Sequence, residues 1–274
     1  MINIVAIFTC FNRKEKTENC IRLISYYNPK IHFKFVVVDD RSSDGTQKML
    51  AELKNEFSIH LIEGDGSLYY SGGMRVGMEY ALNNLPNNFD YMLMLNDDVD
   101  FMPDCIERMV KQSRKQKGSV VVGAMCSQTG NLTYGAIKYT RGIKYRTLGS
   151  DAWEEEADTF NANCVLIPFN AFISTGIMDG HYRHSLGDFD YGLALKKNGY
   201  HIRVSKEYCG YCEKNDQKGT WLDTGLPRSE RIKKKESVKG APTKQWFYFL
   251  KKNFEIVTAV KGCITPYIRI LLGR

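Results

Sequence analysis

The sequence has no long apolar run. A transmembrane helix needs roughly 18 to 20 predominantly apolar residues, and no stretch of the 274 residues reaches that length. The apolar segment Ile2 to Phe8 has no charged region before it and no small-residue cleavage site after it, so it does not resemble a signal peptide. We therefore expect a cytoplasmic protein, with the inner face of a membrane as the alternative location.

Two common phosphate-binding motifs are also missing. The sequence contains neither a P-loop nor the GxGxxG dinucleotide fingerprint, which disfavours an ATPase or a dehydrogenase. Among eight cysteines, Cys209 and Cys212 form one CxxC pair, but no second pair lies at zinc-ribbon spacing. Free, reduced thiols are the better interpretation.

The net charge of +7 is unevenly distributed. Twelve Lys or Arg and only three Asp or Glu lie between Leu226 and Arg274, so the remainder of the chain is slightly acidic. We expect a main domain over residues 1–215, a basic connector forming a solvated loop or mobile lid over 216–242, and an amphipathic helical extension over 243–274.

The spacing of apolar residues predicts an α/β fold. Three continuous apolar runs suit strands buried on both faces of a sheet: Ile2 to Phe8, Phe33 to Val38 and Tyr91 to Leu95. Stretches with helical spacing lie around them, near Thr17 to Tyr27, Thr46 to Glu56 and Met74 to Asn83. Alternating strands and helices are typical of a mostly parallel sheet flanked by helices. After these segments we expect a helix over Asp104 to Lys115 and a strand over Ser119 to Cys126. Further strands, covering one side of the binding site, are expected before Ala157.

In such sheets ligands bind beyond the carboxyl ends of the strands. The segment VVVDDRSSDGT ends a strand with Asp39 and Asp40, whose carboxylates could accept hydrogen bonds from a uracil or thymine base or from ribose hydroxyls. A plain strand-to-helix turn capped by Ser43 or Asp44 is the alternative. It accounts for Asp44 but leaves the adjacent pair of acids unexplained.

A glycine-rich segment, GDGSLYYSGGMRVG, places Gly72 and Gly73 just before a helical pattern, with Arg75 in its first turn. Backbone N–H groups at a helix start favour an anion such as a diphosphate, because glycine allows close approach. This pattern is weak evidence by itself.

The segment LNDDVDF places four polar side chains directly after the most apolar predicted strand: Asn96, Asp97, Asp98 and Asp100. Like charges repel unless a cation lies among them, and carboxylate oxygens select Mg²⁺ or Mn²⁺. An acidic turn facing water is the alternative.

Taken in order, these segments resemble the family 2 glycosyltransferases and their GT-A fold, over roughly residues 2 to 205. TCFNR, with Asn12 and Arg13, is similar to the family's first loop, and NDD at 96–98 to its DxD motif. FNANCVLIP, with Asn161 and Asn163, is similar to the acceptor-side loop, and HSLGDFDYG to the segment that carries the base. No single motif is decisive, whereas the ordered set is specific.

The resemblance implies a role for each matching residue. Thr9, Asp39 and Asp40 would contact the nucleoside, Asp98 would bind the metal, Asp188 would be the catalytic base, and Asp190 would support it. Two positions depart from the family pattern, because Asn96 replaces the first Asp of DxD and Arg75 stands where many members have Asn. Asp97 and Asp100 remain candidates for a second metal ligand. Asp188 could also cap a helix starting near Phe189, and His181 and His184 are interpreted as structural.

The implied activity is that of an inverting hexosyltransferase, similar to bacterial polysaccharide glycosyltransferases and rhamnosyltransferases. The donor would be a UDP- or dTDP-linked sugar, the acceptor a glycan or lipid-linked hydroxyl, and the cofactor Mn²⁺ or Mg²⁺. The alternatives are a nucleotidyltransferase that forms nucleotide-sugars and a non-catalytic binding domain. The basic extension could contact a membrane, pack on the core or form a homodimer interface, whereas no motif supports nucleic acid as a partner.

Overall fold

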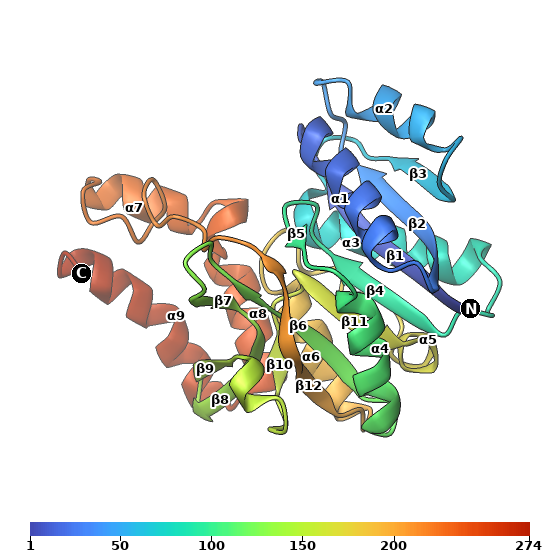
Figure 1. Cartoon of the computed structure of the whole chain (residues 1–274). Helices are drawn as coiled ribbons and strands as arrows, with labels where there is room; N and C mark the ends of the chain where they lie inside the picture. Colours follow the sequence, from blue (N-terminus) through green and yellow to red (C-terminus); the bar gives the residue numbers. More distant parts are fainter.

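The apolar runs form the first strands of a nine-stranded sheet. The computed structural model describes residues 1–274 (Figure 1). Strands β1 (Ile2–Cys10), β2 (Ile31–Asp39), β3 (Ile59–Glu63) and β4 (Tyr91–Leu95) pair in parallel in the order β3-β2-β1-β4. Every side chain of β4 is buried, as a parallel strand covered on both faces requires. The carboxyl ends of these strands meet at one edge of the sheet.

The second half of the sheet mixes directions. Strand β11 (Cys164–Pro168) runs antiparallel between β4 and β6 (Val120–Cys126), and β12 (Ile202–Tyr211) lies parallel to β6. The short strands β5 (Asp100–Phe101) and β7 (Leu132–Tyr134) pair with β12 and β6. The predicted mostly parallel sheet is thus parallel in its first half and mixed beyond β4.

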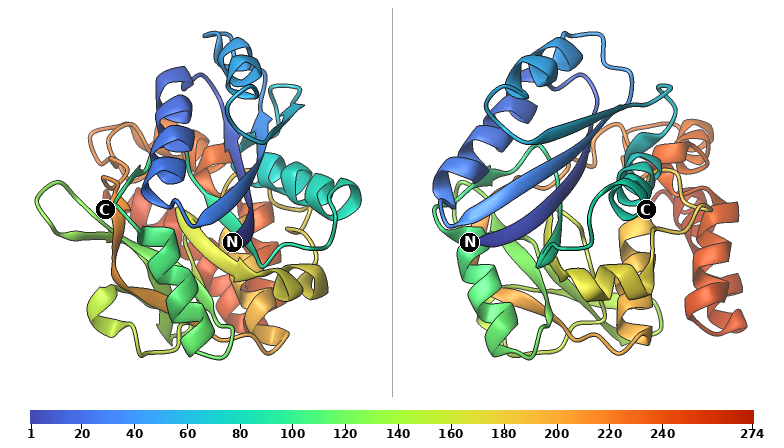
Figure 2. Two further views of the ribbon diagram at one scale, coloured as in Figure 1. Left: turned by 45° about the vertical axis from the view of Figure 1, so that its right-hand side comes forward. Right: turned by 90° about the vertical axis from the view of Figure 1, so that its right-hand side faces the viewer.

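Helices cover both faces of the sheet. One face packs against α1 (Lys14–Tyr27), α2 (Thr46–Leu53) and α4 (Cys105–Lys115). The other packs against α3 (Tyr69–Asn84), α5 (Phe169–Thr175) and α6 (Gly187–Lys197). Figure 2 shows α1 and α3 on opposite sides of the first strands. The predicted α/β fold with flanking helices is confirmed.

A second, three-stranded sheet occupies the Gly/Thr/Tyr-rich region. Its antiparallel strands have the order β10 (Thr159–Phe160), β8 (Ala136–Arg141) and β9 (Lys144–Leu148). Strands were expected in this region, and β10 leads directly into the turn that precedes β11.

The chain ends in three helices beside the second half of the sheet: α7 (Arg228–Lys235), α8 (Thr243–Asn253) and α9 (Ile256–Leu271). The helical extension over 243–274 is therefore present. None of the helices in the structure combines the length and apolar character needed to span a bilayer.

The expectation of a solvated loop over 216–242 is wrong for its second half. That part forms α7, and it buries the basic side chains of Arg231 and Lys235. The Lys235 ammonium donates to Glu236, to Thr243 and to the Ala241 carbonyl, which offsets the cost of removing its charge from water. The run of lysines resembled a solvated segment because sequence does not show which of them finds buried partners.

Candidate active site

A cavity of about 740 Å³ lies at the carboxyl edge of the sheet. It is bounded by the ends of β1, β2 and β4, the β10–β11 turn, the start of α6, and the connector near Lys239. Of the residues predicted to bind ligands, the cavity is lined by Thr9, Arg13, Asp40, Asn96, Asp97, Asp98, Asn161, Asn163 and Asp188. The remaining predicted residues do not line it: Asn12, Asp39, Gly72, Gly73, Arg75 and Asp190.

The acidic cluster after β4 is neutralised in part by Arg13. One guanidinium nitrogen, Nη1, lies 2.9 Å from Asp97 Oδ1 and 2.9 Å from Asp98 Oδ2. The second Asp97 oxygen accepts from the Thr17 hydroxyl at 2.8 Å. Burial raises the pKa of Asp97, and Arg13 opposes that shift. Both Asp97 oxygens are therefore occupied by the chain itself, which does not fit a second metal ligand.

Asp98 differs from its neighbour in having a free oxygen. Its Oδ1 is buried and has no hydrogen-bond partner, although 27% of the side chain is exposed. A buried oxygen without a donor normally indicates a missing partner such as an ion or water. No group of three or more His, Cys, Asp or Glu side chains in the structure could hold a metal alone. Asp98 therefore suits a cation that takes its other oxygens from a bound ligand.

The two acids after β2 hold loops together. Asp39 is fully buried and accepts from the Ser42 amide at 3.0 Å and from the Ser42 hydroxyl. Asp40 accepts from the amides of Gly66, Leu68 and Tyr69 at 2.9 to 3.2 Å. These bonds account for two adjacent acids without a ligand.

The loop after β1 is tied to the loop after β2. Asn12 Oδ1 accepts from the Ser43 amide at 2.7 Å, so Asn12 joins the two loops instead of lining the cavity. Thr9 lines the cavity while its hydroxyl donates to the Val38 carbonyl at 3.1 Å. The mutual bonding of these loops fixes the edge of the sheet at the cavity.

The glycines Gly72 and Gly73 lie inside α3 and contact other parts of the chain, which corrects their predicted position before the helix. The helix begins at Tyr69, so Gly72 and Gly73 lie within its first turn. A Cβ at Gly73 would lie 2.4 Å from Thr9 Oγ1, so only glycine lets α3 approach β1 this closely. The Gly72 amide donates to the Arg183 carbonyl at 3.1 Å, and Arg75 donates to the Tyr182 carbonyl at 3.4 Å. These donors are directed at the chain and not into the cavity.

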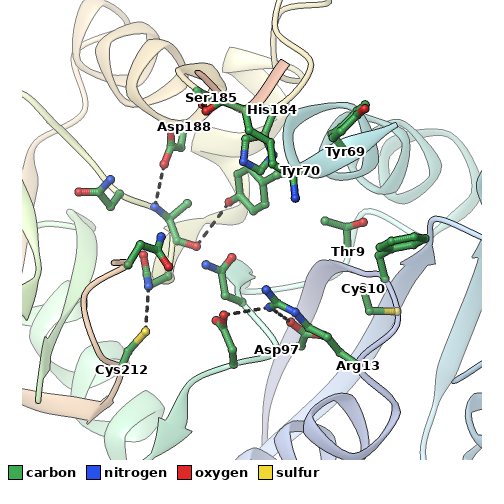
Figure 3. A pocket seen from close by; sticks show the side chains of 18 of the residues that line it. Thr9, Cys10, Arg13, Tyr69, Tyr70, Asp97, His184, Ser185, Asp188 and Cys212 are labelled. Carbon is green, nitrogen blue, oxygen red and sulfur yellow. Dashed lines mark hydrogen bonds and ion pairs between the residues drawn. The ribbon is translucent and has the colours of Figure 1, made fainter. Parts of the chain in front are cut away.

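Asp188 lies on the opposite side of the cavity from Arg13 and Asp97 (Figure 3). It is the second residue of α6, which starts at Gly187 after Leu186 in the left-handed region. Each carboxylate oxygen accepts one backbone bond, from Ala162 at 3.2 Å and from Phe189 at 2.9 Å. Burial nevertheless raises the pKa of Asp188 to about 6. The backbone hydrogen bonds at the start of α6 oppose this shift but do not cancel it.

The β10–β11 turn carries Asn161 and Asn163 into the cavity. The Asn163 carbonyl accepts from the Asn96 amide at 3.0 Å, which joins this turn to the end of β4. The Asn163 side chain donates to Cys212 Sγ at 3.4 Å. All eight cysteines are unpaired.

Asp190 does not line the cavity and bonds α8, which does not fit the predicted role of supporting Asp188 at the substrate. It is buried, and its oxygens bind Lys252 at 2.7 Å and Asn253 at 2.8 Å. Residues that are two positions apart on a helix point to nearly opposite faces. Asp190 therefore fastens α8 to the helix that carries Asp188.

Several cavity residues carry no clear signal in the sequence. His184 lines the cavity with a buried Nδ1 that has no partner, and burial, assisted by Lys239, lowers the pKa of His184. This shift favours the neutral imidazole. Phe11 presents an aromatic ring that is 53% exposed, and Lys239 enters from the connector. His181, by contrast, bonds Asp179 at 2.8 Å outside the cavity, as expected of a structural histidine.

Comparison with known sequences identifies the family. Residues 5–176 match the family model described as glycosyl transferase family 2. The low-salt glycan biosynthesis hexosyltransferase Agl10 of Haloferax volcanii is 24% identical over 152 residues, which cover 53% of this chain and 47% of that protein. The chain spans about half the length of the curated relatives it matches.

Similar solved structures agree in fold. The mannosyltransferase PcManGT from Pyrobaculum calidifontis, in complex with GDP-Man and Mn²⁺, has a TM-score of 0.61 at 13% identity, covering 98% of this chain and 70% of that chain. TarS 1-349 of S. aureus, in complex with UDP-GlcNAc, has a TM-score of 0.56 at 13% identity, covering 99% of this chain and 80% of that chain. Such low identity shows the fold alone, and that fold is GT-A. The family model matches more than half of the residues of this chain, and the chain therefore belongs to glycosyl transferase family 2.

Proposed function

We propose that this chain is an inverting glycosyltransferase that moves a hexose from a UDP- or dTDP-linked donor to a hydroxyl of a glycan or lipid-linked acceptor. The observation that best supports this proposal is that Asp98 and Asp188 line one cavity from different elements. Asp98 has a free buried oxygen, and Asp188 has a raised pKa. Family membership supports sugar transfer. The solved neighbours bound to GDP-Man and UDP-GlcNAc support a nucleotide-sugar donor.

Asp188 acts as the general base in this proposal. It accepts the proton of the acceptor hydroxyl while that oxygen bonds to the anomeric carbon. The bond from the same carbon to the diphosphate oxygen breaks, and the nucleoside diphosphate leaves with the electron pair. A single displacement of this kind inverts the anomeric centre. A pKa of about 6 leaves Asp188 ionised at neutral pH and still basic enough to assist.

Asp98 would hold Mn²⁺ or Mg²⁺ through its free oxygen, with the diphosphate of the donor as a further ligand. When bound, the cation supplies positive charge that stabilises the departing diphosphate. Arg13 fixes the other Asp98 oxygen and adds a positive charge at the same edge. Asn96, which replaces the first acid of the DxD pattern, lines the cavity as a neutral hydrogen-bonding group.

The nucleoside would occupy the side of the cavity formed by Thr9 and Phe11. An exposed aromatic ring offers a base a stacking surface. Asp39 and Asp40 would shape this side indirectly, through the loops that they hold. Neutral His184 and the half-buried start of α6 would face the sugar and the acceptor.

A role in cell-surface glycan assembly is our proposal for the biological context. It is supported by the hexosyltransferase from Haloferax volcanii, which is named for low-salt glycan biosynthesis. The alternative of a nucleotidyltransferase is disfavoured because β1 is followed by Phe11, Asn12 and Arg13, with no glycine to wrap a triphosphate.

The test is nucleotide release by the full chain from a panel of UDP-, dTDP- and GDP-sugars with Mn²⁺ or Mg²⁺, with water or simple glycans as acceptors. We expect metal-dependent release that chelation abolishes, and NMR of the product should show inversion. Retention of configuration would exclude single displacement. The absence of both turnover and metal-dependent nucleotide binding would leave the non-catalytic alternative.

A further inference from the structure

Helix α9 carries an exposed apolar face on the outside of the molecule. Its large apolar side chains are exposed by 46 to 63%: Ile256, Val257, Val260, Ile264, Ile268, Leu271 and Leu272. The recurring spacing of three and four residues places most of them on one stripe of the helix. Single exposed apolar residues are ordinary, whereas a continuous stripe marks an interaction surface. We call these seven residues the α9 stripe.

The opposite face of α9 is fixed to the protein. Ala259, Gly262, Cys263 and Ile270 are buried, and α9 packs on α8 and α7. Pro266 cannot donate to the carbonyl four residues earlier, that of Gly262. The Trp246 indole N–H of α8 donates to this freed carbonyl at 3.0 Å. The contact fixes the rotation of α9, so its buried residues face the protein and the exposed α9 stripe faces outward. Figure 1 shows α9 at the outer edge of the molecule.

The charges around the stripe are mostly positive, although the exposed Glu255 precedes it. Lys261 and Arg269 are exposed on α9, which contains no acidic residue between Ile256 and Leu271. Lys251, Lys244 and Arg274 add to the excess of basic residues in the same part of the chain. An apolar face flanked by basic side chains is complementary to an anionic lipid surface, where apolar residues enter the headgroup boundary and cations meet phosphates.

A second copy of the chain is a poorer occupant. A helix of this length is about 24 Å long and about 10 Å wide, so its open face offers roughly 240 Å². Stable dimers bury about 800 Å² on each partner. Pairing two stripes would also bring together two basic surfaces.

We propose that α9 is a peripheral membrane-binding element that lies flat on an anionic bilayer and inserts the α9 stripe. The proposal rests on the C-terminal helices alone and does not depend on the sugar-transfer activity. It explains why apolar side chains remain outside a helix whose inner face is already packed.

The experiment is co-sedimentation of the full chain with phosphatidylcholine vesicles and with vesicles of phosphatidylcholine and phosphatidylglycerol in equal parts. We expect binding to the anionic vesicles that weakens with salt. The variant Ile264→Ser/Ile268→Ser should lower the partition coefficient at least about tenfold, since each loses buried apolar area. Ile173→Ser, at an exposed isoleucine of α5, is the matched control and should bind like the parent chain.

The charge contribution is tested with Lys261→Gln/Arg269→Gln against Lys48→Gln/Lys54→Gln, which removes two exposed lysines near α2. Only the first pair should weaken binding to anionic vesicles. Circular dichroism melts check that the surface variants fold. Parent chain that stays in the supernatant with both vesicle types, or an Ile264→Ser/Ile268→Ser variant that binds normally, would overturn the proposal. A dimer in light scattering that this variant dissociates would assign the stripe to a second copy instead.

Discussion

Two groups of acids in and around the cavity use their carboxylates differently. Asp39, Asp40 and Asp97 have both oxygens bonded to donors of the chain. Asp98 keeps one oxygen without a partner, and Asp188 accepts one bond on each oxygen while its pKa is raised to about 6. Asp97 is paired with the Arg13 cation, and Asp39 and Asp40 hold loops. Asp98 has a free oxygen and Asp188 is bonded only to neutral backbone amides, so these two acids remain available for chemistry. Substituting the two groups should therefore affect different observables.

The largest effect is expected for Asp188→Asn. Loss of a general base should lower kcat by about 10²- to 10⁴-fold and leave donor binding unchanged. Burial raises the pKa of Asp188, so removing its charge should stabilise the fold at neutral pH, whereas the Asn nitrogen cannot accept one of the two backbone bonds from Ala162 and Phe189. These effects oppose each other, so the melting temperature should change little. Nucleotide-release assays and calorimetry measure both. A variant that still transfers sugar at the parent rate would remove Asp188 from the base role.

The same residue sets a pH dependence. Asp188 accepts protons only when ionised, so kcat/KM should rise with pH up to about 6 and level off above it. A pH–rate profile of the parent chain provides the measurement. An activity that stays constant from pH 5 to pH 7, a window chosen around that pKa, would contradict the assignment.

The next effect is expected for Asp98→Asn. Replacing the free carboxylate oxygen by a neutral group should weaken Mn²⁺-dependent donor binding roughly 10- to 100-fold. Titration calorimetry with and without metal makes the comparison. Asp100→Asn, at an exposed acid of the same segment, is the control and should bind the donor like the parent chain. Equal losses in the two variants would point to general electrostatics and against a specific ligand.

Asp40→Asn should instead reduce stability. The side-chain nitrogen of Asn cannot accept a hydrogen bond, so at least one of the three backbone amides that donate to Asp40 loses its partner. The expected cost is about 1–2 kcal/mol in the free energy of unfolding. Urea unfolding measures the change. Asp65→Asn, at an exposed acid of the same loop, should have a smaller effect. An unchanged midpoint for Asp40→Asn would show that these bonds contribute little.

The smallest effect is expected for Lys252→Met, which removes one partner of buried Asp190. Lys252 is about one-third exposed, so screening limits the loss to about 1 kcal/mol. Lys251→Met, at the exposed neighbouring residue, should be neutral. A several-fold loss of kcat at unchanged KM in Lys252→Met alone would show that α8 positions the first turn of α6. An unchanged kcat would limit this contact to stability.

Some of this organisation followed from local patterns. Continuous apolar runs predicted strands covered on both faces, and polar residues after parallel strands were expected to meet at one edge of the sheet. That reasoning brought Asp39, Asp40 and Asp98 to one edge, whereas Asp188 entered the candidate site only through the family resemblance. The structure places Asp40, Asp98 and Asp188 at one cavity. The ordered set of motifs was sufficient for the family, which the family model confirms.

The tertiary structure decided which of these side chains are bonded within the chain and which remain free to bind a ligand. Arg13 and Asp97 are 84 positions apart, yet their ion pair removes Asp97 from the acids that were candidate metal ligands and leaves Asp98 with a free oxygen. Likewise, the glycines of α3 are explained by the closeness of β1, and Asp190 is turned from the cavity toward α8. Sequence determined which residues gather at the edge of the sheet, because strand ends follow from local periodicity. Tertiary structure decided which oxygens remain unbonded, because each bond depends on partners brought together by the whole fold.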